Sequence, residues 1–205
     1  MRCQSRNVIG PLTAVLVSVL LTLSAVSSAA KDIYRYKRLW PTLQQPWYFS
    51  FPNDVATDAD GYVYIADTFS YRIQKYTADG GFVTAWDCGA LSPGTVSVGP
   101  RGDIYVAGDR EWVLRFSPDG RFLSSWPIFN DGAATGMAID HRGVVSIADG
   151  FDHVITQYTT DGDFIRRWDT TIGDEPGQLN GPWDLAADDK GFVYIADIHN
   201  HRVQK

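Results

Sequence analysis

The chain of 205 residues has little cysteine and no surplus of basic residues. Of its two cysteines, Cys3 lies in an N-terminal segment that we expect to be removed, and Cys88 alone cannot form an internal disulfide. Lys and Arg together number 18 against 24 Asp and Glu, which leaves a formal charge of -6 at pH 7. A phosphate-binding surface needs a basic stripe. The composition therefore argues against a disulfide-stabilised fold and against nucleic-acid binding.

No apolar run is long enough to cross a membrane. The main one, Leu12–Val26, has about fifteen residues, whereas a spanning helix needs roughly twenty. Arg2 and Arg6 precede it and a run of small residues ending at Ala30 follows it, which is the pattern of a secretory signal peptide. We predict a signal peptide over residues 1–30, cleaved after Ala30. The protein is then exported to the periplasm, the cell surface or the extracellular space with no membrane span; the alternative is retention as an uncleaved anchor.

The arrangements that mark common catalytic sites are also missing. The sequence shows no Ser-His-Asp arrangement, cysteine nucleophile, glycine-rich phosphate loop or dense histidine cluster. His199 and His201 stand close to Asp197, but a histidine pair without a third ligand is a weak zinc pattern. We expect both to be exposed loop residues. These absences favour a binding protein over an enzyme without deciding between them.

The sequence contains one motif that occurs four times. Gly61–Asp67, GYVYIAD, returns as Gly102–Gly108, Gly143–Asp149 and Gly191–Asp197, and the leading glycines are 41, 41 and 48 residues apart. A period near forty is typical of a unit that buries its apolar surface against copies of itself. The repeats extend over about residues 52–87, 94–127, 135–169 and 182–205.

Each repeat divides into short runs rich in Val, Ile, Tyr and Phe that are separated by turn residues, which predicts four antiparallel strands. The second run, such as Tyr62–Ala66, is apolar almost throughout, so both of its faces must be covered. A blade packed between two other blades meets that need. We predict an all-β fold over residues 31–205, a β-propeller of four-stranded antiparallel blades.

An aromatic residue and a tryptophan four positions later recur in the fourth run of the first three repeats. This spacing places both rings on one face of a strand, and we expect them to form core contacts with the next blade. The pairs are Phe82 with Trp86, Phe122 with Trp126 and Phe164 with Trp168. Tyr36 and Trp40 fit the same pattern, so residues 34–40 are predicted to be an orphan outer strand that completes the last blade of a closed ring.

Two of the repeats resemble the NHL-repeat family of β-propellers. Pro52–Tyr76 and Pro182–Lys205 share with that family a strand ending in Asp, a Gly, a second strand ending in Ala-Asp, and then an Arg-Ile-Gln-Lys or Arg-Val-Gln-Lys segment. The resemblance covers residues 34–205. Because the family is usually six-bladed, it implies that the chain holds about three and a half blades and is C-terminally truncated. The alternative is a closed four-bladed ring.

Several charged and aromatic residues of the repeats are predicted to be structural. An Asp that ends the second strand and an Arg that begins the third are expected to form a hydrogen-bonded pair inside the blade rather than a ligand site. The predicted structural residues are Asp67, Arg72, Asp149, Asp197, Arg202, Trp86, Trp126 and Trp168. Gly108 replaces the aspartate in the second repeat and Val154 replaces the arginine in the third, so the pair is not expected in every blade.

Asp54 and Asp184 are the candidate binding residues. Each stands at the start of an innermost strand, where the second and third repeats have Thr95 and Gly136, and innermost strands of a propeller line its central channel. Two carboxylates at the channel mouth predict a site for calcium or another divalent cation, which prefers oxygen ligands. The alternative is that each carboxylate accepts hydrogen bonds from backbone amides at the strand entry.

The predicted function is that of a binding or scaffold module, an exported monomer that presents a loop-lined face to a protein or an extracellular polymer. No cofactor other than the divalent cation is predicted. The resemblance also implies an alternative, a metal-dependent propeller enzyme similar to the amidating lyases or the calcium-dependent lactonases. Its channel site would need ligands from further blades, so enzymatic activity stays open.

Overall fold

The computed structural model describes residues 48–128, 133–168 and 171–205. The predicted signal peptide, residues 1–30, and the predicted outer strand, residues 34–40, lie outside these ranges. Within them the chain forms β-strands and two single turns of 3-10 helix, η1 (Thr68–Ser70) and η2 (Ile198–Asn200). No helix in the described ranges is long and apolar enough to cross a membrane.

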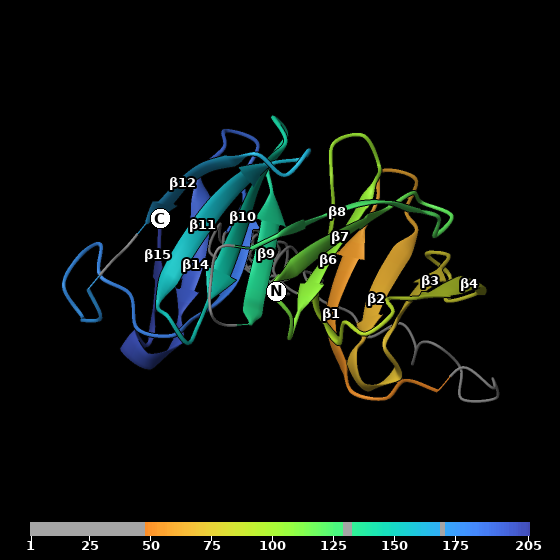
Figure 1. Cartoon of the computed structure of the whole chain (residues 1–205), viewed down its shortest axis with the longest axis horizontal. Coiled ribbons are helices and arrows are strands. Elements are labelled where there is room, and N and C mark those ends of the chain that lie inside the picture. The colour runs from red at the N-terminus through yellow and green to blue at the C-terminus, as the bar shows by residue number, and fades with distance from the viewer. Residues whose placement is uncertain (1–47, 129–132, 169–170) are drawn as a thin grey trace, which may run out of the picture. The chain divides into compact units, whose positions relative to one another are not determined.

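The strands pair into four antiparallel sheets, each built from consecutive strands, which we number blades 1 to 4 (Figure 1). Blade 1 contains β1 (Pro52–Thr57), β2 (Val63–Asp67), β3 (Arg72–Tyr76) and β4 (Phe82–Asp87). Blade 2 contains β5 (Pro93–Val98), β6 (Ile104–Gly108), β7 (Trp112–Phe116) and β8 (Phe122–Pro127). Blade 3 contains β9 (Ala134–Ile139), β10 (Val144–Asp149), β11 (Val154–Thr159) and β12 (Phe164–Trp168). Blade 4 contains β13 (Pro182–Ala187), β14 (Val193–Asp197) and β15 (Arg202–Gln204).

The fold class predicted from the repeats is confirmed. The described chain is all-β, and its four antiparallel blades form a propeller-like ring, the arrangement given above as the alternative to six blades. The strand ranges agree with the repeat boundaries, because the same turn residues that broke the sequence pattern also end the strands.

Each repeated motif begins at a turn that needs its glycine. Gly61 in blade 1 has a φ of 83°, in the left-handed region that favours glycine. Asp58 closes the same turn, because its carboxylate accepts the N–H groups of Asp60 and Tyr62 and the hydroxyl of Tyr64. Blade 4 repeats these bonds. The aspartate that ends the first strand is therefore a turn-forming residue.

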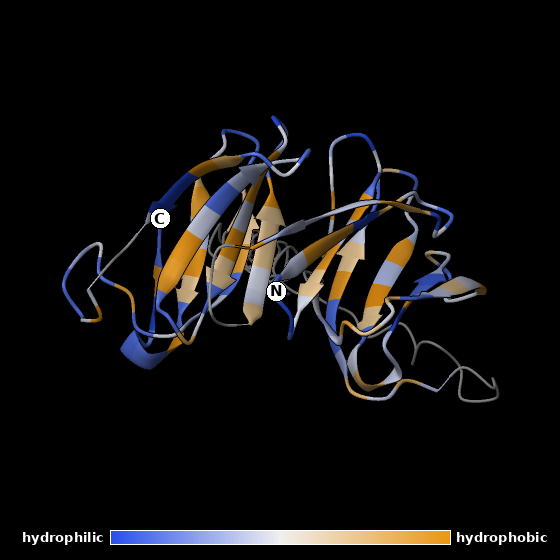
Figure 2. Ribbon diagram, in the orientation of Figure 1, coloured by the Kyte–Doolittle hydropathy of each residue, from blue (hydrophilic) through white to orange (hydrophobic). Residues whose placement is uncertain are grey.

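The first strand of each blade is the innermost. β1, β5, β9 and β13 contact one another in that order, and β2, β6 and β10 pack against the inner strand of the following blade. The second strands are mostly buried, as their apolar sequence predicts, and in β6 all five residues are buried. Apolar residues accordingly concentrate on the strands, while the connecting loops are mostly hydrophilic (Figure 2).

The core of the described chain lies between the blades. Each pair of consecutive blades shares a cluster of buried apolar side chains. In the first cluster Tyr64 and Ile73 of blade 1 pack with Val106 of blade 2. Burying a large apolar side chain contributes about 1.5–3 kcal/mol. A single blade cannot bury these side chains alone, so the blades stabilise one another.

Trp86 and Trp126 pack against the next blade, as the repeated column predicts. A Cβ atom built on Gly120 would lie 2.6 Å from the Trp86 ring, and one built on Gly162 would lie 2.7 Å from the Trp126 ring. Glycine is required in both turns because the indole lies directly against the backbone. The tryptophan column therefore links blades 1 and 2 to the turn between the last two strands of the blade that follows each of them.

The prediction that the aromatic residue four positions before the tryptophan is a core residue is wrong in two repeats. Phe122 and Phe164 are predicted above as core residues, but they are 55% and 51% exposed. Each ring stands nearly perpendicular to the ring of Phe116 or Tyr158 on the preceding strand. Because β8 and β12 are edge strands of their sheets, only the tryptophan end of the column reaches the next blade.

Candidate binding face

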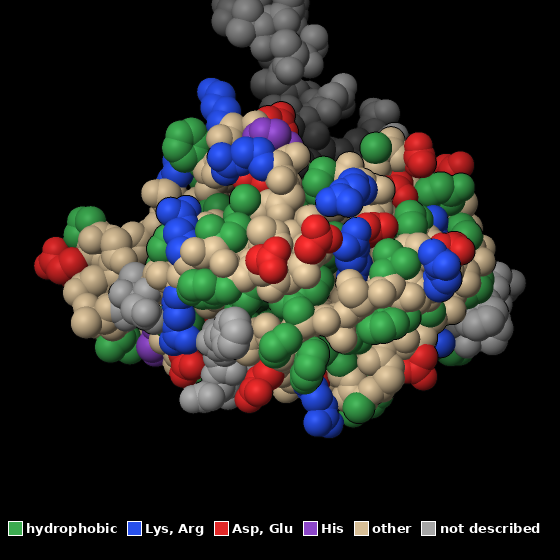
Figure 3. Space-filling model, turned by 45° about the horizontal axis from the view of Figure 1, so that its top comes forward, with side chains coloured by type: hydrophobic (Ala, Val, Ile, Leu, Met, Phe, Trp, Pro, Cys, Tyr) green, Lys and Arg blue, Asp and Glu red, His purple; other side chains and the backbone are tan. Residues whose placement is uncertain are grey.

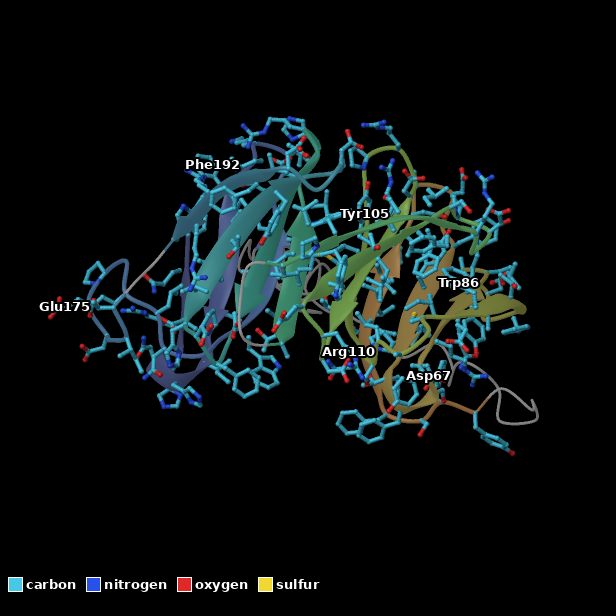
Figure 4. The ribbon with its side chains drawn as sticks, in the orientation of Figure 1. Asp67, Trp86, Tyr105, Arg110, Glu175 and Phe192 are labelled. Atoms are coloured by element: carbon cyan, nitrogen blue, oxygen red, sulfur yellow. The ribbon has the colours of Figure 1, made fainter. Side chains whose placement is uncertain are left out.

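The two ends of the blades differ in character. The end that comes forward in Figure 3 carries basic and acidic side chains that are interspersed. The other end is formed by the starts of the inner strands and by the loops between the second and third strands of each blade, and we call it the loop face. Asp67 and Arg110 lie at this end in Figure 4, and Phe192 lies at the opposite end.

Exposed aromatic side chains gather on the loop face. Phe51, Phe69, Phe151 and Trp183 come from blades 1, 3 and 4, with exposed fractions between 47% and 66%. Phe51 stacks on Phe69 with ring centroids 4.8 Å apart and planes inclined by 16°. Isolated exposed apolar side chains are normal, but a group of them around a hollow indicates a binding surface.

A groove of about 410 Å³ lies among these rings. Phe69, Tyr71, Phe151 and Trp183 line it, and we call it the aromatic groove. This site is not predicted from the sequence. Phe69, Tyr71 and Phe151 follow the second strands of their blades, and Trp183 lies in β13. Phe69 and Phe151 share a repeat position, but no aromatic residue stands there in the second and fourth repeats, so the pattern did not single them out.

The central hollow of the ring holds the two candidate carboxylates. This channel has a volume of about 260 Å³ and is lined by residues of β1, β5, β9 and β13, including Asp54 and Asp184. The carboxylate of Asp54 accepts the hydroxyl of Thr95 and the amide of Val96, both at 2.8 Å, as well as the amide of Val55. Asp184 accepts the amide of the next residue in its own strand.

The two carboxylates influence each other electrostatically. Burial raises the pKa of Asp184 above its ordinary value, the Leu185 amide partly offsets that rise, and the negative charge of Asp54 adds to it. Asp54 and Asp184 are the titratable side chains in the channel lining. Neither carboxylate has an ion pair with a basic residue of the described chain. The channel mouth is therefore an acidic site without a counter-charge among the described residues.

The two predicted ion pairs lie inside their blades. Arg72 Nε donates to Asp67 at 2.8 Å, Arg202 Nε donates to Asp197 at 2.9 Å, and both carboxylates are fully buried. Burial by itself raises the pKa of Asp197, but hydrogen bonds led by that of the Asn200 side chain bring it below its ordinary value. These contacts are the geometry expected of structural pairs.

Blades 2 and 3 satisfy the corresponding position differently. A side chain at Gly108 would collide with the carbonyl of Ser92, and Asp109, one residue later, accepts the Ser92 amide at 2.8 Å instead. In blade 3 the buried Asp149 accepts the amide of Phe151, while its Oδ2 atom has no hydrogen-bond partner. The same sequence position therefore has three different environments.

A larger cavity, of about 640 Å³, lies between blades 3 and 4 beside Trp168. At the first blade interface the matching tryptophan, Trp86, contacts Phe116 and the turn at Gly120. The cavity thus occupies the place that a strand end and its turn occupy at that interface. Its lining is basic, with Arg142, Arg166 and Lys205, and contains no carboxylate or histidine among the described residues.

The described residues form no complete set of metal ligands at the candidate sites. His199 and His201 are exposed, as expected for loop histidines. No group of three or more His, Cys, Asp or Glu side chains in the described ranges is placed to hold a metal ion. A calcium or other divalent cation at Asp54 and Asp184 stays a prediction.

The comparisons with known proteins agree with this architecture. The segment 179–205 matches the family model described as NHL repeat. The fourth repeat is an NHL repeat. The resemblance predicted for Pro182–Lys205 is therefore confirmed. No curated protein matches the chain.

The chain is also similar to solved propeller structures. A streptogramin B lyase structure gives a TM-score of 0.65 at 16% identity, covering 78% of this chain and 52% of that chain. A catalytically inactive variant of virginiamycin B lyase from Staphylococcus aureus, with quinupristin, gives a TM-score of 0.64 at 17% identity, covering 78% and 53%. The chain thus spans about half the length of these structures. At such identities the likeness shows the fold alone.

Proposed function

We propose that this protein is an exported NHL-repeat propeller that binds a protein or an extracellular polymer through its loop face. The observation that carries the proposal is the group of exposed rings around the aromatic groove, Phe69, Phe151 and Trp183, which comes from three different blades. Aromatic side chains supply a large contact area at a low cost in conformational entropy. Binding surfaces are enriched in such residues.

The binding proposal is tested with a triple variant, Phe69→Ala, Phe151→Ala and Trp183→Ala. Wild type and variant are immobilised and exposed to a phage-displayed library of random peptides and to a panel of polysaccharides that includes cellulose, chitin and dextran. We expect ligands retained by the wild type to be lost by the triple variant. They should still bind Phe122→Ala, which removes a ring of similar exposure from the outer strand β8. Equal retention by wild type and triple variant would contradict the proposal.

Export is proposed from residues 1–30 and has its own test. The full chain is expressed in a host with a general secretory system, and the exported product is sequenced from its N-terminus. A mature protein that begins at Lys31 is the expected result. Retention of the uncleaved chain in the membrane would favour the anchor instead. Six blades, which the resemblance implies, and a monomeric state stay predictions.

An enzyme is the second candidate, and the carboxylate pair in the channel favours it. A carboxyl group with a raised pKa beside a second carboxylate in a hollow, as at Asp184 and Asp54, is a pattern found in acid–base catalysis. The test is incubation with quinupristin, the compound present in one of the similar structures, followed by mass spectrometry. A modified product that is absent with Asp184→Asn would support this candidate; an unchanged compound would argue against this particular reaction.

A further inference from the structure

Adjacent residues of β1 and β13 line the aromatic groove and the carboxylate channel. Asn53 and Trp183 line the groove, and the residues that follow them, Asp54 and Asp184, line the channel. One extended ligand can therefore contact the rings and the carboxylates together.

The groove and channel carry negative charge that no lining residue compensates. Their linings include Asp54, Asp109 and Asp184 and contain no Lys, Arg or His among the described residues. The hydrogen bonds that these carboxylates accept come from neutral amides and one hydroxyl. Arg110 stands beside Asp109, but its Nε donates to the carbonyl of Ala90, and it lines neither hollow.

We propose that the loop face receives a cationic polypeptide segment, with a Lys or Arg side chain between Asp54 and Asp184 and with neighbouring apolar side chains in the aromatic groove. This inference rests on the proposed binding function and names the chemistry of the partner. A cationic head group forms charge-assisted hydrogen bonds with carboxylates, and its alkyl stem packs against aromatic rings.

A polypeptide fits these features better than a bare metal ion. A hard cation such as calcium takes six to eight oxygen ligands, whereas the channel lining offers two carboxylates. A metal ion also gives no role to Phe69, Phe151 and Trp183, while a peptide strand uses both the rings and the charges. Charge complementarity and apolar area together select a basic segment with apolar neighbours.

The test compares two synthetic pentapeptide libraries that differ in one group. Both have Gly, Leu, Phe or Trp at the four outer positions; the central residue is Lys in one and Nε-acetyl-lysine in the other. Peptides retained on the immobilised full chain are counted by mass spectrometry. Because acetylation removes the charge and keeps the stem, we expect the Lys library to be retained about tenfold better.

The double variant Asp54→Asn with Asp184→Asn should lose this preference, while Asp60→Asn, an exposed carboxylate at the other end of the blades, should keep it. If both libraries bind equally and the aromatic triple variant loses both, the cationic partner is wrong and the binding function stands. Retention of neither library also overturns the inference, and the polysaccharide panel then decides the proposed function. Binding of the acetylated library by the double variant shows that this variant is folded.

Discussion

At the scale of single residues, the partners of a carboxylate decide what it does. Asp67, Asp149 and Asp197 end the second strands of three blades and are all fully buried. Asp67 and Asp197 have arginine partners, whereas Asp149 Oδ2 has no hydrogen-bond partner. The sequence shows which aspartate lost its arginine, because Val154 stands at that position, but not what the carboxylate does in its absence.

This difference predicts unequal costs for the same substitution. Asp67→Asn removes the charged acceptor of Arg72 Nε and Gln74 Nε2 and should lower the free energy of unfolding by about 2–3 kcal/mol. Asp149→Asn can retain the acceptor that binds the Phe151 amide, so it should cost less than about 1 kcal/mol. Urea unfolding of both variants measures the difference. Equal losses would show that the ion pair contributes little.

Asp184 predicts a pH dependence of stability. Its pKa is raised in the folded chain, so the folded state binds this proton more tightly than the unfolded state does. The ionised carboxylate therefore destabilises the fold at neutral pH, and this penalty disappears as the pH falls through the raised pKa. Asp184→Asn should raise stability at pH 7 by less than about 1 kcal/mol, because the side chain is partly exposed, and the gain should vanish below about pH 4. A gain that persists in acid would refute the assignment.

At the scale of strands and turns, the repeated sequence determines most of what is observed. The apolar second strands are buried, and the glycine turns stand where the sequence predicts them. The tryptophan column adds a packing requirement to the conformational one at two of those glycines, Gly120 and Gly162. Gly120 meets both requirements, since its φ is 86° and the Trp86 ring lies against it.

The two requirements are separated by a matched pair of substitutions. Gly177 has a φ of 87° and nothing within 4 Å of a built Cβ atom, so Gly177→Ala should cost only the backbone strain of about 1 kcal/mol. Gly120→Ala carries the same strain and also displaces the indole, so it should cost about 3 kcal/mol. Thermal unfolding measures both. Similar losses in the free energy of unfolding would mean that the Trp86 ring moves aside at little cost.

The features that the sequence did not predict depend on what the neighbouring blade covers. Phe122 and Phe164 lie on the same edge strands as Trp126 and Trp168, but no neighbouring blade covers the phenylalanine rings. Phe151 is an aromatic residue in a loop, where the strand pattern makes no prediction, and it lines the aromatic groove. Exposure of such residues is set by tertiary packing, which a periodic pattern does not record.

At the scale of the whole described chain, consecutive blades share apolar clusters and their inner strands surround one channel. The blade interfaces form the stable core, so the loops at their ends are free to vary in sequence. The aromatic groove lies largely on such loops and on the first residues of the inner strands, whereas the carboxylate channel is lined by the inner strands themselves. Sequence reasoning located Asp54 and Asp184 because both stand at the start of an innermost strand. It missed the rings because they do not recur at the same position in all four repeats.

The central claim is that the loop face is the binding surface, and hydroxyl-radical footprinting tests it most directly. The full chain is oxidised with and without the peptide that the Lys library retains best, and modification is measured at each aromatic residue. We predict that the peptide protects Phe69, Phe151 and Trp183 and leaves Phe122 and Phe164 unchanged, although all five are about half exposed in the free protein. Protection of Phe122 or Phe164 with unchanged oxidation of the groove residues would contradict the account.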